Sequence, residues 1–287
     1  MTPRAATAAI AAPIRSSDAV PLRGWRARLA LEFVRRPTRT VLQRRRHEGP
    51  LLIQRPFYPE GEVCHAYIIH PPGGVVGGDE LTVEVDVAAQ AHALLTTPAA
   101  GKFYRSAGAS AQLAQRLTMH DGLLEWLPQE NIFYPGAQVR AVTRADLTGS
   151  ARFLGWEISC YGLPAGSAAF DCGRVRQGFE LWRQGQPLLL EHLRMDAECQ
   201  RARWGLAGQV ACGTLVAYPA AAPQLSAVRD GLGEADGIAA TLVDDVLLVR
   251  ATDARADRIR QRFIHLWSLL RPALMGREAM APRIWST

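Results

Sequence analysis

Segments in which hydrophobic and polar residues alternate recur through most of the chain and predict β-strands. In the clearest of them, residues 81–87, every second residue is Leu or Val and the residues between are Thr, Glu and Asp. Similar segments are Ala66–Ile69, Gln112–Met119, Gln138–Thr143, Arg152–Cys160, Arg174–Trp182, Pro187–Leu193, Gln209–Tyr218 and Ile238–Arg250. Glycine and proline separate them, as in turns between short strands. The pattern predicts a mainly β fold, without distinguishing a sandwich, a barrel or a stack of coils.

An amphipathic helix is predicted near the C-terminus, from about residue 253 to 271. Its apolar residues recur at helical spacing, Thr252 or Asp253 can cap its first turn, and Pro272 is expected to end it. The opposite face carries arginines. We favour a helix that packs on the core with this face in solvent over a helix that binds a partner. A shorter helix is predicted around Pro223–Leu232.

The segment His70–Asp79 is rich in glycine and proline and separates two of the predicted strands. Proline fixes φ, and glycine permits positive φ and the close approach of other groups. We therefore expect a shaped, rigid loop, with His70 at its entrance and Asp79 at its exit. The alternative is an unusually Gly-rich turn with no further role.

The composition fits a folded protein of a reducing compartment. Of the 287 residues 48% are hydrophobic and 21% charged. The five cysteines are widely spaced and odd in number, which favours a cytoplasmic location over a disulfide framework. Residues 1–23 are rich in alanine without the leucine-rich centre of a signal peptide, so we expect a disordered tail, followed by a single domain from 24 to 287. No segment has the ~20 apolar residues that span a bilayer.

The net charge of +6 comes almost entirely from arginine, because Lys102 is the one lysine. A nucleic-acid-binding surface would combine a basic stripe with stacking aromatic residues, and the tight basic run Arg44–Arg46 has none beside it. We therefore expect no nucleic-acid partner. Lys102 is expected either to hold a structural ion pair with a buried carboxylate or to contact a partner.

Catalytic motifs are missing. Thr96–Phe103 resembles a phosphate-binding loop but lacks its first glycine and the Ser or Thr after its lysine. Gly162–Gly166 lacks the serine of a nucleophile elbow, and the sequence has no His-Glu-x-x-His pair. We expect that the chain is not an enzyme.

Candidate metal ligands are present but sparse. Imidazole and thiolate suit nickel, copper and zinc, whereas carboxylates are less selective. The candidates are Cys64, His65, His70, Asp79, Glu125 and Glu130. For each of them the alternative is structural: a buried cysteine, a hydrogen-bonded histidine, a carboxylate that forms surface hydrogen bonds, or, for Asp79, a cap on the loop.

Three blocks of the sequence resemble the signature of the urease accessory protein D family (UreD, also called UreH). The blocks are His70–Asp79, Thr96–Ser106 and Leu124–Gly136, in the same order as in the family. Weaker similarity runs through Phe153–Glu157 and Phe170–Arg174, so that the resemblance extends from about Trp25 to about Pro272.

This resemblance implies a fold and a role. UreD-like proteins are described as β-helix-like stacks of short strands with a small helical part. They are non-enzymatic scaffolds that bind apo-urease and accessory protein F, which recruits the nickel-carrying GTPase, accessory protein G. We therefore expect the chain to help insert nickel into the urease active site, without a membrane partner.

Within the family, a water-filled passage through the D-type protein is a proposed route for nickel. Such a conduit should be lined by sparse, weak ligands, because a closed cage of Cys and His would trap the ion. We expect no permanently bound cofactor, transient nickel, and His70, Asp79, Glu125 and Glu130 as passage or interface residues. The alternatives are a β-helix-like hydrolase or lyase with paired carboxylates, and a standalone nickel-binding protein.

Overall fold

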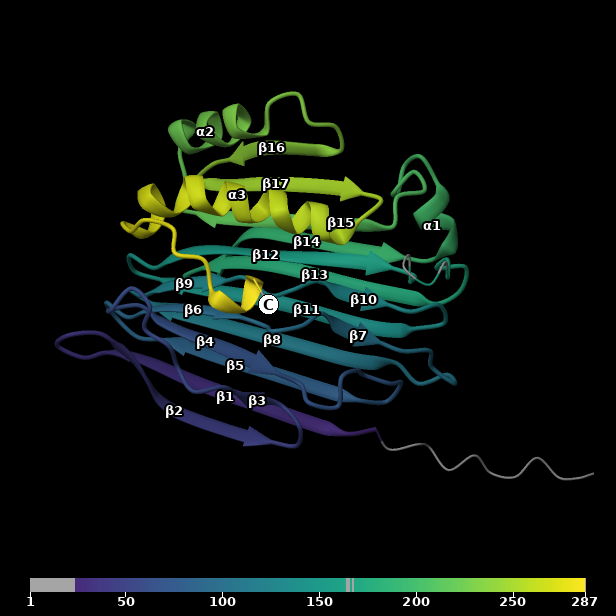
Figure 1. Ribbon diagram of the computed structural model, residues 1–287, viewed down its shortest axis with the longest axis horizontal. Coiled ribbons are helices and arrows are strands. Elements are labelled where there is room, and N and C mark those ends of the chain that lie inside the picture. The colour runs from purple at the N-terminus through teal and green to yellow at the C-terminus, as the bar shows by residue number, and fades with distance from the viewer. Residues whose placement is uncertain (1–23, 164–165, 167, 287) are drawn as a thin grey trace, which may run out of the picture.

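A computed structural model describes residues 24–163, 166 and 168–286. The tail predicted for residues 1–23 lies outside the described residues, and the proposed domain boundary after residue 23 stays a prediction. Within the described part, two stacked β-sheets carry three α-helices (Figure 1). No helix in this part is long and apolar enough to cross a membrane.

The strands and helices have the following bounds. The first sheet runs in the spatial order β14 (Gln186–Met195), β13 (Arg174–Arg183), β11 (Gln138–Thr148), β8 (Ala111–His120), β5 (Glu80–Val87), β1 (Arg26–Arg35) and β2 (Thr40–Glu48). The second runs β16 (Ile238–Val243), β17 (Val246–Asp253), β15 (Ala211–Tyr218), β12 (Arg152–Tyr161), β9 (Leu123–Trp126), β6 (His92–Thr96), β4 (Cys64–Ile69) and β3 (Leu52–Ile53), with β10 (Asn131–Phe133) beside β12 and β7 (Gly101–Phe103) beside β10. The helices are α1 (Ala197–Arg201), α2 (Ala222–Leu232), α3 (Ala256–Met275) and a 3-10 turn at Arg283–Ser286.

The middle of the chain coils between the two sheets. After β5 it crosses to β6, returns to β8, crosses to β9, returns to β11, crosses to β12 and returns to β13. Each return adds a parallel strand to the first sheet and each crossing adds one to the second. Parallel neighbours need a long crossover, and here a strand of the opposite sheet supplies it. The mainly β, β-helix-like stack with a small helical part is confirmed.

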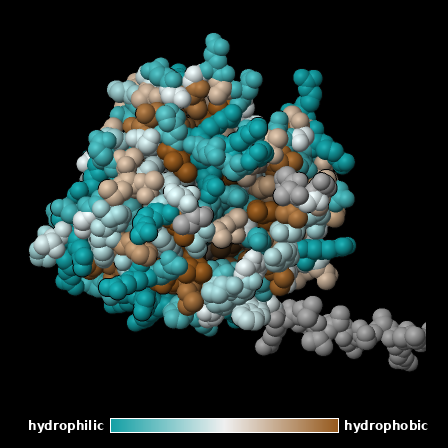
Figure 2. Space-filling model, viewed as in Figure 1, coloured by the Kyte–Doolittle hydropathy of each residue, from teal (hydrophilic) through white to brown (hydrophobic). Residues whose placement is uncertain are grey.

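The core lies on both faces of the second sheet. Residues such as Val83 and Phe153 point inward and pack between the two sheets. On the other face of the second sheet, Trp156 and Ile158 pack against α3. A strand that is buried on both faces reads as a nearly continuous apolar run, as β12 does. The outer face of the first sheet is polar. Figure 2 shows the face that carries α3, where apolar areas are interrupted by polar residues.

The Gly-rich loop joins β4 to β5, as predicted. Gly73 and Gly78 have φ of 75° and 94°, a region that residues with a side chain rarely adopt. Gly74 lies against the ring of Tyr104, and a Cβ there would be 2.0 Å from the ring. These glycines are therefore needed for the path of the backbone and for its close packing.

One predicted strand is wrong in extent. Ile238–Arg250 forms a hairpin, not a single strand, because β16 and β17 are joined by a two-residue turn. Val243 pairs with Val246 across this turn, and Asp244 has φ of 52°. Aspartate tolerates this left-handed conformation better than most residues, so the Asp-Asp pair marks the turn.

The end of the long helix also differs from the prediction. Pro272 was expected to stop it at residue 271, yet α3 continues through the proline to Met275 and is capped by Gly276 in the left-handed conformation. Leu270, Leu274 and Met275 are all buried against the second sheet and its surroundings. Their packing outweighs the hydrogen bond that proline cannot donate. The shorter helix predicted around Pro223–Leu232 is confirmed as α2.

Replacement of Pro272 by alanine should therefore stabilise the protein. Pro272→Ala restores a backbone donor inside α3, and we expect the free energy of unfolding to rise by ~1 to 3 kcal/mol. Urea denaturation measures the change. Pro223→Ala is the control, because Pro223 lies in the first turn of α2, where proline is tolerated. Equal effects of the two substitutions would contradict this explanation.

Candidate functional site

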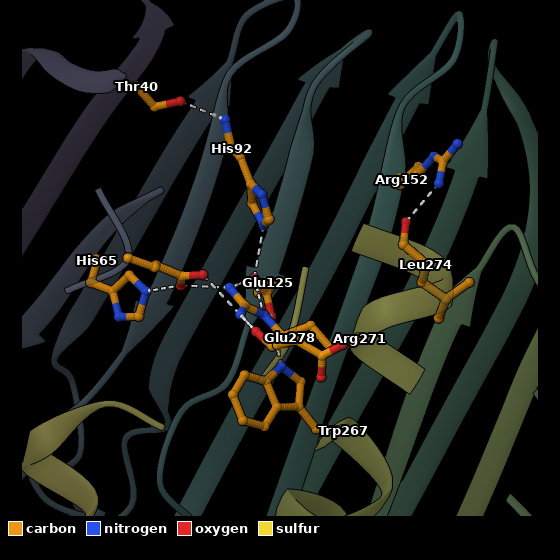
Figure 3. Close-up of polar contacts among 10 residues, drawn as sticks. Thr40, His65, His92, Glu125, Arg152, Trp267, Arg271, Leu274 and Glu278 are labelled. Atoms are coloured by element: carbon orange, nitrogen blue, oxygen red, sulfur yellow. Dashed lines mark hydrogen bonds and ion pairs between the residues drawn. The ribbon is translucent and has the colours of Figure 1, made fainter. Parts of the chain in front are cut away.

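A fully buried carboxylate, Glu125 of β9, joins α3 to the second sheet. Its side chain is 0% exposed. The Nε2 atom of His92 in β6 lies 2.8 Å from Oε1, and the indole N–H of Trp267 donates to Oε2 at 2.6 Å. Arg271 donates from Nε to Oε2 at 2.9 Å and from Nη2 to Oε1 at 3.0 Å. Figure 3 shows that the histidine approaches from the strands and the other two residues from the helix.

Arg271 also holds a second carboxylate, Glu60, which precedes β4. Its Nη2 and Nη1 atoms donate to Glu60 at 2.6 and 2.9 Å, and Nη1 donates to the backbone carbonyl of Glu278 beyond the helix. His65 of β4 lies 2.6 Å from Glu60 through Nε2. An ionised carboxylate only accepts, so Nε2 carries the proton, and Nδ1 of His65 is left buried without a partner. We call these residues the α3 anchor: Glu60, His65, His92, Glu125, Trp267 and Arg271.

The electrostatics of the α3 anchor favour the ionised forms. Burial alone raises the pKa of Glu125, but the hydrogen bond and charge of His92 and the charge of Arg271 outweigh it and bring the pKa to about 2. Glu60 also has a lowered pKa, because His65 and Arg271 outweigh its burial. Removal of either carboxylate would leave the buried guanidinium incompletely paired, which is strongly destabilising. The α3 anchor therefore fixes the position of α3 on the sheet.

Glu125 was predicted as a passage or interface residue, and the structure gives it a different set of contacts. Both of its oxygens are occupied by donors from His92, Trp267 and Arg271. A metal ion would have to displace a buried arginine to reach them. The geometry is that of a structural anchor.

The structure brings His70 and Asp79 together in one pocket of about 190 Å³ beside the Gly-rich loop. Burial lowers the pKa of His70, and the charge of Asp79 opposes this effect. Asp79 accepts the backbone N–H groups of Trp25 and Val76 at 2.8 and 2.9 Å. It thus caps the loop, which was the structural alternative for this residue.

Glu130 lies apart from that pocket, between β9 and β10. Its Oε2 atom is buried without a hydrogen-bond partner. Burial, together with the charge of Glu130, raises the pKa of the Cys160 thiol to about 11. Lys102 forms no ion pair within the described residues, so the expected pair with a buried carboxylate is not found there.

A second polar feature, which was not predicted, lies between the two sheets. Glu157 of β12, Thr214 of β15 and Arg250 of β17 are in register across three neighbouring strands. Glu191 of β14, from the opposite sheet, accepts the Thr214 hydroxyl at 2.9 Å and two bonds from Arg250 at 3.2 and 3.1 Å. Polar side chains therefore bridge the sheets at this level of an otherwise apolar interior.

The polar contacts continue inward from Glu157. Its carboxylate accepts a hydrogen bond from Thr143 of β11, whose hydroxyl lies 2.6 Å from the side-chain oxygen of Gln115 in β8. We call these six side chains the inter-sheet polar line: Arg250, Glu191, Thr214, Glu157, Thr143 and Gln115. It borders a cavity of about 50 Å³, which has room for a single small ion or a few water molecules. The cavity is lined by Glu157, Ser159, Gln177, Gly178, Phe179, Glu191, Leu193, Cys212, Gly213 and Thr214.

The two carboxylates of the inter-sheet polar line influence each other. Burial raises the pKa of Glu157, the hydrogen bond from Thr143 lowers it, and the negative charge of Glu191 raises it further, to about 7. Burial raises the pKa of the Cys212 thiol to about 12. Near neutral pH, both the protonated and the ionised form of Glu157 are therefore populated, whereas Cys212 stays a thiol.

No cluster of three or more His, Cys, Asp or Glu side chains suitable for holding a metal occurs in the described part of the chain. The inter-sheet polar line supplies carboxylate, hydroxyl and amide oxygens at intervals. Such ligands suit divalent cations but bind them weakly when they are few.

Two signals in the sequence could have revealed these residues. Glu157 is the one charged residue within the apolar run Phe153–Cys160. Arg271 follows Trp267 by one helical turn and so falls on the apolar face of α3. A charged side chain at a position that must be buried requires a partner, and the sequence could not name that partner.

Removal of one member of the α3 anchor should be strongly destabilising. Arg271→Met removes the arginine shared by two buried carboxylates and leaves each with fewer donors, and we expect a loss of ~3 to 5 kcal/mol in the free energy of unfolding. The double variant Arg271→Met/Glu125→Gln should lose less than the sum of its single variants. Arg255→Met is the control, because its pair with Asp257 is exposed and should contribute less than ~1 kcal/mol. Additive single effects would contradict direct coupling.

The contribution of Glu125 should also depend on pH. Its pKa is lower in the folded protein than in the unfolded chain, so its stabilising effect is complete above ~4.3 and is lost as the pH falls toward about 2. We expect the difference in unfolding free energy between the native protein and Glu125→Gln to shrink over this range. Denaturant titrations at a series of pH values test this. A difference that stays constant under acidic conditions would contradict it.

Comparison with known proteins identifies the family. The family model described as "UreD urease accessory protein" matches residues 25–286. A urease accessory protein UreD from Azoarcus sp. (strain BH72) is 46% identical over 92% of this chain and 95% of the relative. Those from Alcanivorax borkumensis and Klebsiella aerogenes are each 43% identical, over 92% of this chain and 93% and 98% of the relatives. The chain therefore belongs to the UreD family of urease accessory proteins, as the three sequence blocks predicted.

Proposed function

We propose that this chain is a non-enzymatic scaffold of the cytoplasm that helps to insert nickel into apo-urease, in a complex with accessory proteins F and G. Its membership of a urease accessory protein family supports a role in urease maturation. The nickel route and the individual partners are our proposal. A rigid β-helix-like body, with α3 fixed by a buried anchor, suits a platform on which other proteins dock.

We further propose that nickel passes along the inter-sheet polar line. The observation that carries this proposal is the row of side-chain oxygens between the sheets. Glu191 accepts from Thr214, Thr214 is in register with Glu157, and Glu157 accepts from Thr143. An interior of this kind is normally closed by apolar side chains, because unpaired polar groups are costly to bury. Here the polar groups are paired with one another, and their oxygens provide ligands along which a cation can pass.

The chemistry of Glu157 suits transient binding. With a pKa of about 7, its carboxyl can release a proton when a cation arrives and take one up when the cation leaves. Glu157 and Glu191 provide charge, while Ser159, Thr214 and Gln177 provide neutral oxygens. Few charged ligands keep the affinity low, so that the ion moves on instead of being stored.

The four residues named from the sequence divide under this proposal. Glu125 serves as an anchor that keeps α3 on the sheet. His70 and Asp79, beside the Gly-rich loop, and Glu130, with its unpartnered oxygen, stay predicted interface or passage residues.

Two other functions make different predictions. A hydrolase or lyase would turn over a substrate unaided, by paired carboxylates in an open groove. A standalone nickel-binding protein would hold the ion tightly without its partners. For tight nickel binding, the described residues contain no cluster of three or more His, Cys, Asp or Glu side chains that could hold the ion.

Loss of the carboxylate at Glu157 should impair nickel delivery without preventing assembly of the complex. With Glu157→Gln, we expect urease matured in cells to contain several-fold less nickel per active site, because the amide carries no charge. Nickel is measured by mass spectrometry on purified urease, and co-purification with accessory protein F and apo-urease reports assembly. Glu234→Gln, an exposed position after α2, is the matched control.

Normal nickel content with Glu157→Gln would contradict the proposed route. Failure of the native chain to co-purify with urease or with accessory protein F would contradict the scaffold itself.

A further inference from the structure

A positively charged side chain, that of Arg250, lies at the outer end of the inter-sheet polar line. Arg250 is exposed on β17, beside the edge strand β16, and its guanidinium donates from Nε and Nη2 to both oxygens of Glu191, at 3.2 and 3.1 Å. This two-point contact uses the full hydrogen-bonding capacity of one edge of the guanidinium. Glu191 thus faces Arg250 on one side and the cavity on the other.

The register of the sheet sets this position. Arg250 of β17 is directly opposite Thr214 of β15, which is directly opposite Glu157 of β12. Side chains opposite one another in neighbouring strands lie on the same face of the sheet. Arg250 is therefore the outermost polar member of the row that leads inward to Glu157, and the row ends at Ala239 of β16. Val246 and Leu248, on the same face of β17 as Arg250, belong to the core between the sheets.

We propose that Arg250 acts as a latch that determines which cations enter the polar line: its guanidinium occupies Glu191 until a divalent metal ion displaces it. This inference rests on the proposed function, because it assigns a control to the same route. With the latch closed, Glu191 is neutralised. A divalent ion at Glu191 releases the guanidinium to solvent and leaves Glu157 as the next carboxylate along the line.

The strength of the contact suits a reversible latch. Half of the Arg250 side chain is exposed, and such ion pairs are worth at most ~1 kcal/mol. A divalent ion bound by Glu191, the Thr214 hydroxyl and water can compete with a contact of that size. A monovalent ion brings half the charge, so the guanidinium retains the carboxylate.

A matched pair on the other sheet allows a controlled test. Arg28 and Glu84, on the outer face of the first sheet, have side-chain exposures of 60% and 27%, against 54% and 25% for Arg250 and Glu191. Both arginines donate from Nε and Nη2. Arg28 donates both bonds to one oxygen of Glu84, which also lies 3.6 Å from Arg116, whereas Arg250 contacts both oxygens of Glu191. Arg250 borders the polar line, and Arg28 borders an open surface groove.

The test is a calorimetric titration of Ni²⁺ into the full-length chain co-purified with accessory protein F. Removal of a competitor worth ~1 kcal/mol should tighten Ni²⁺ binding by about fivefold in Arg250→Met. Arg28→Met should bind like the native chain, and Arg250→Met/Glu191→Gln should lose the gain. Thermal unfolding of each variant verifies that it is folded. If Arg250→Met is not folded, Arg250→Gln provides an alternative substitution with a polar side chain.

Equal Ni²⁺ affinity of the native chain and Arg250→Met would overturn the latch, as would a gain that persists without the Glu191 carboxylate. The proposed route is judged separately by the nickel content of urease matured with Glu157→Gln. If that content falls while Arg250→Met binds normally, the route stands and the latch is wrong. If neither substitution has an effect, both proposals are overturned.

Discussion

The structure depends on one constraint: charged groups inside the protein must be paired within it. The second sheet has a buried carboxylate on each face, Glu125 of β9 and Glu157 of β12, and each has specific partners. Glu125 faces α3 and is held by His92, Trp267 and Arg271. Glu157 faces the opposite sheet and is held by Thr143. Burial favours the neutral form of both acids; the partners of Glu125 outweigh this effect, whereas the hydrogen bond from Thr143 does not outweigh it at Glu157.

The two environments give the two carboxylates opposite chemistry. His92 and Arg271 lower the pKa of Glu125 to about 2, so its carboxylate acts as a fixed charge. Glu157 has no cationic partner among its hydrogen-bond contacts in the described chain, and the nearby charge of Glu191 raises its pKa to about 7. A fixed charge positions a helix, whereas a carboxyl that titrates near neutrality can exchange a proton for a cation. The same residue type therefore serves as an anchor on one face of the sheet and as a proposed ligand on the other.

Much of the fold could be predicted from local pattern, because alternation and turn residues are local signals. The strand at residues 81–87, the Gly-rich loop and α2 appear as expected. Pattern missed what depends on tertiary packing. The continuation of α3 past Pro272 is driven by Leu274 and Met275. Most residues of β2 are exposed, and it was not recognised as a strand; β1 was also missed, although its residues alternate between buried and more exposed positions.

The site was harder to predict than the fold, since it consists of pairs that are distant in sequence. Arg271 meets Glu125 across 146 positions, and Arg250 meets Glu191 across 59. The packing of α3 on the second sheet and of the two sheets on each other brings them together. The most direct test of the central claim is to locate nickel by anomalous diffraction in crystals of the chain with accessory protein F, exposed to Ni²⁺. The account predicts a nickel peak between the sheets, within coordination distance of Glu157 or Glu191, and nickel found only on the outer surface would contradict it.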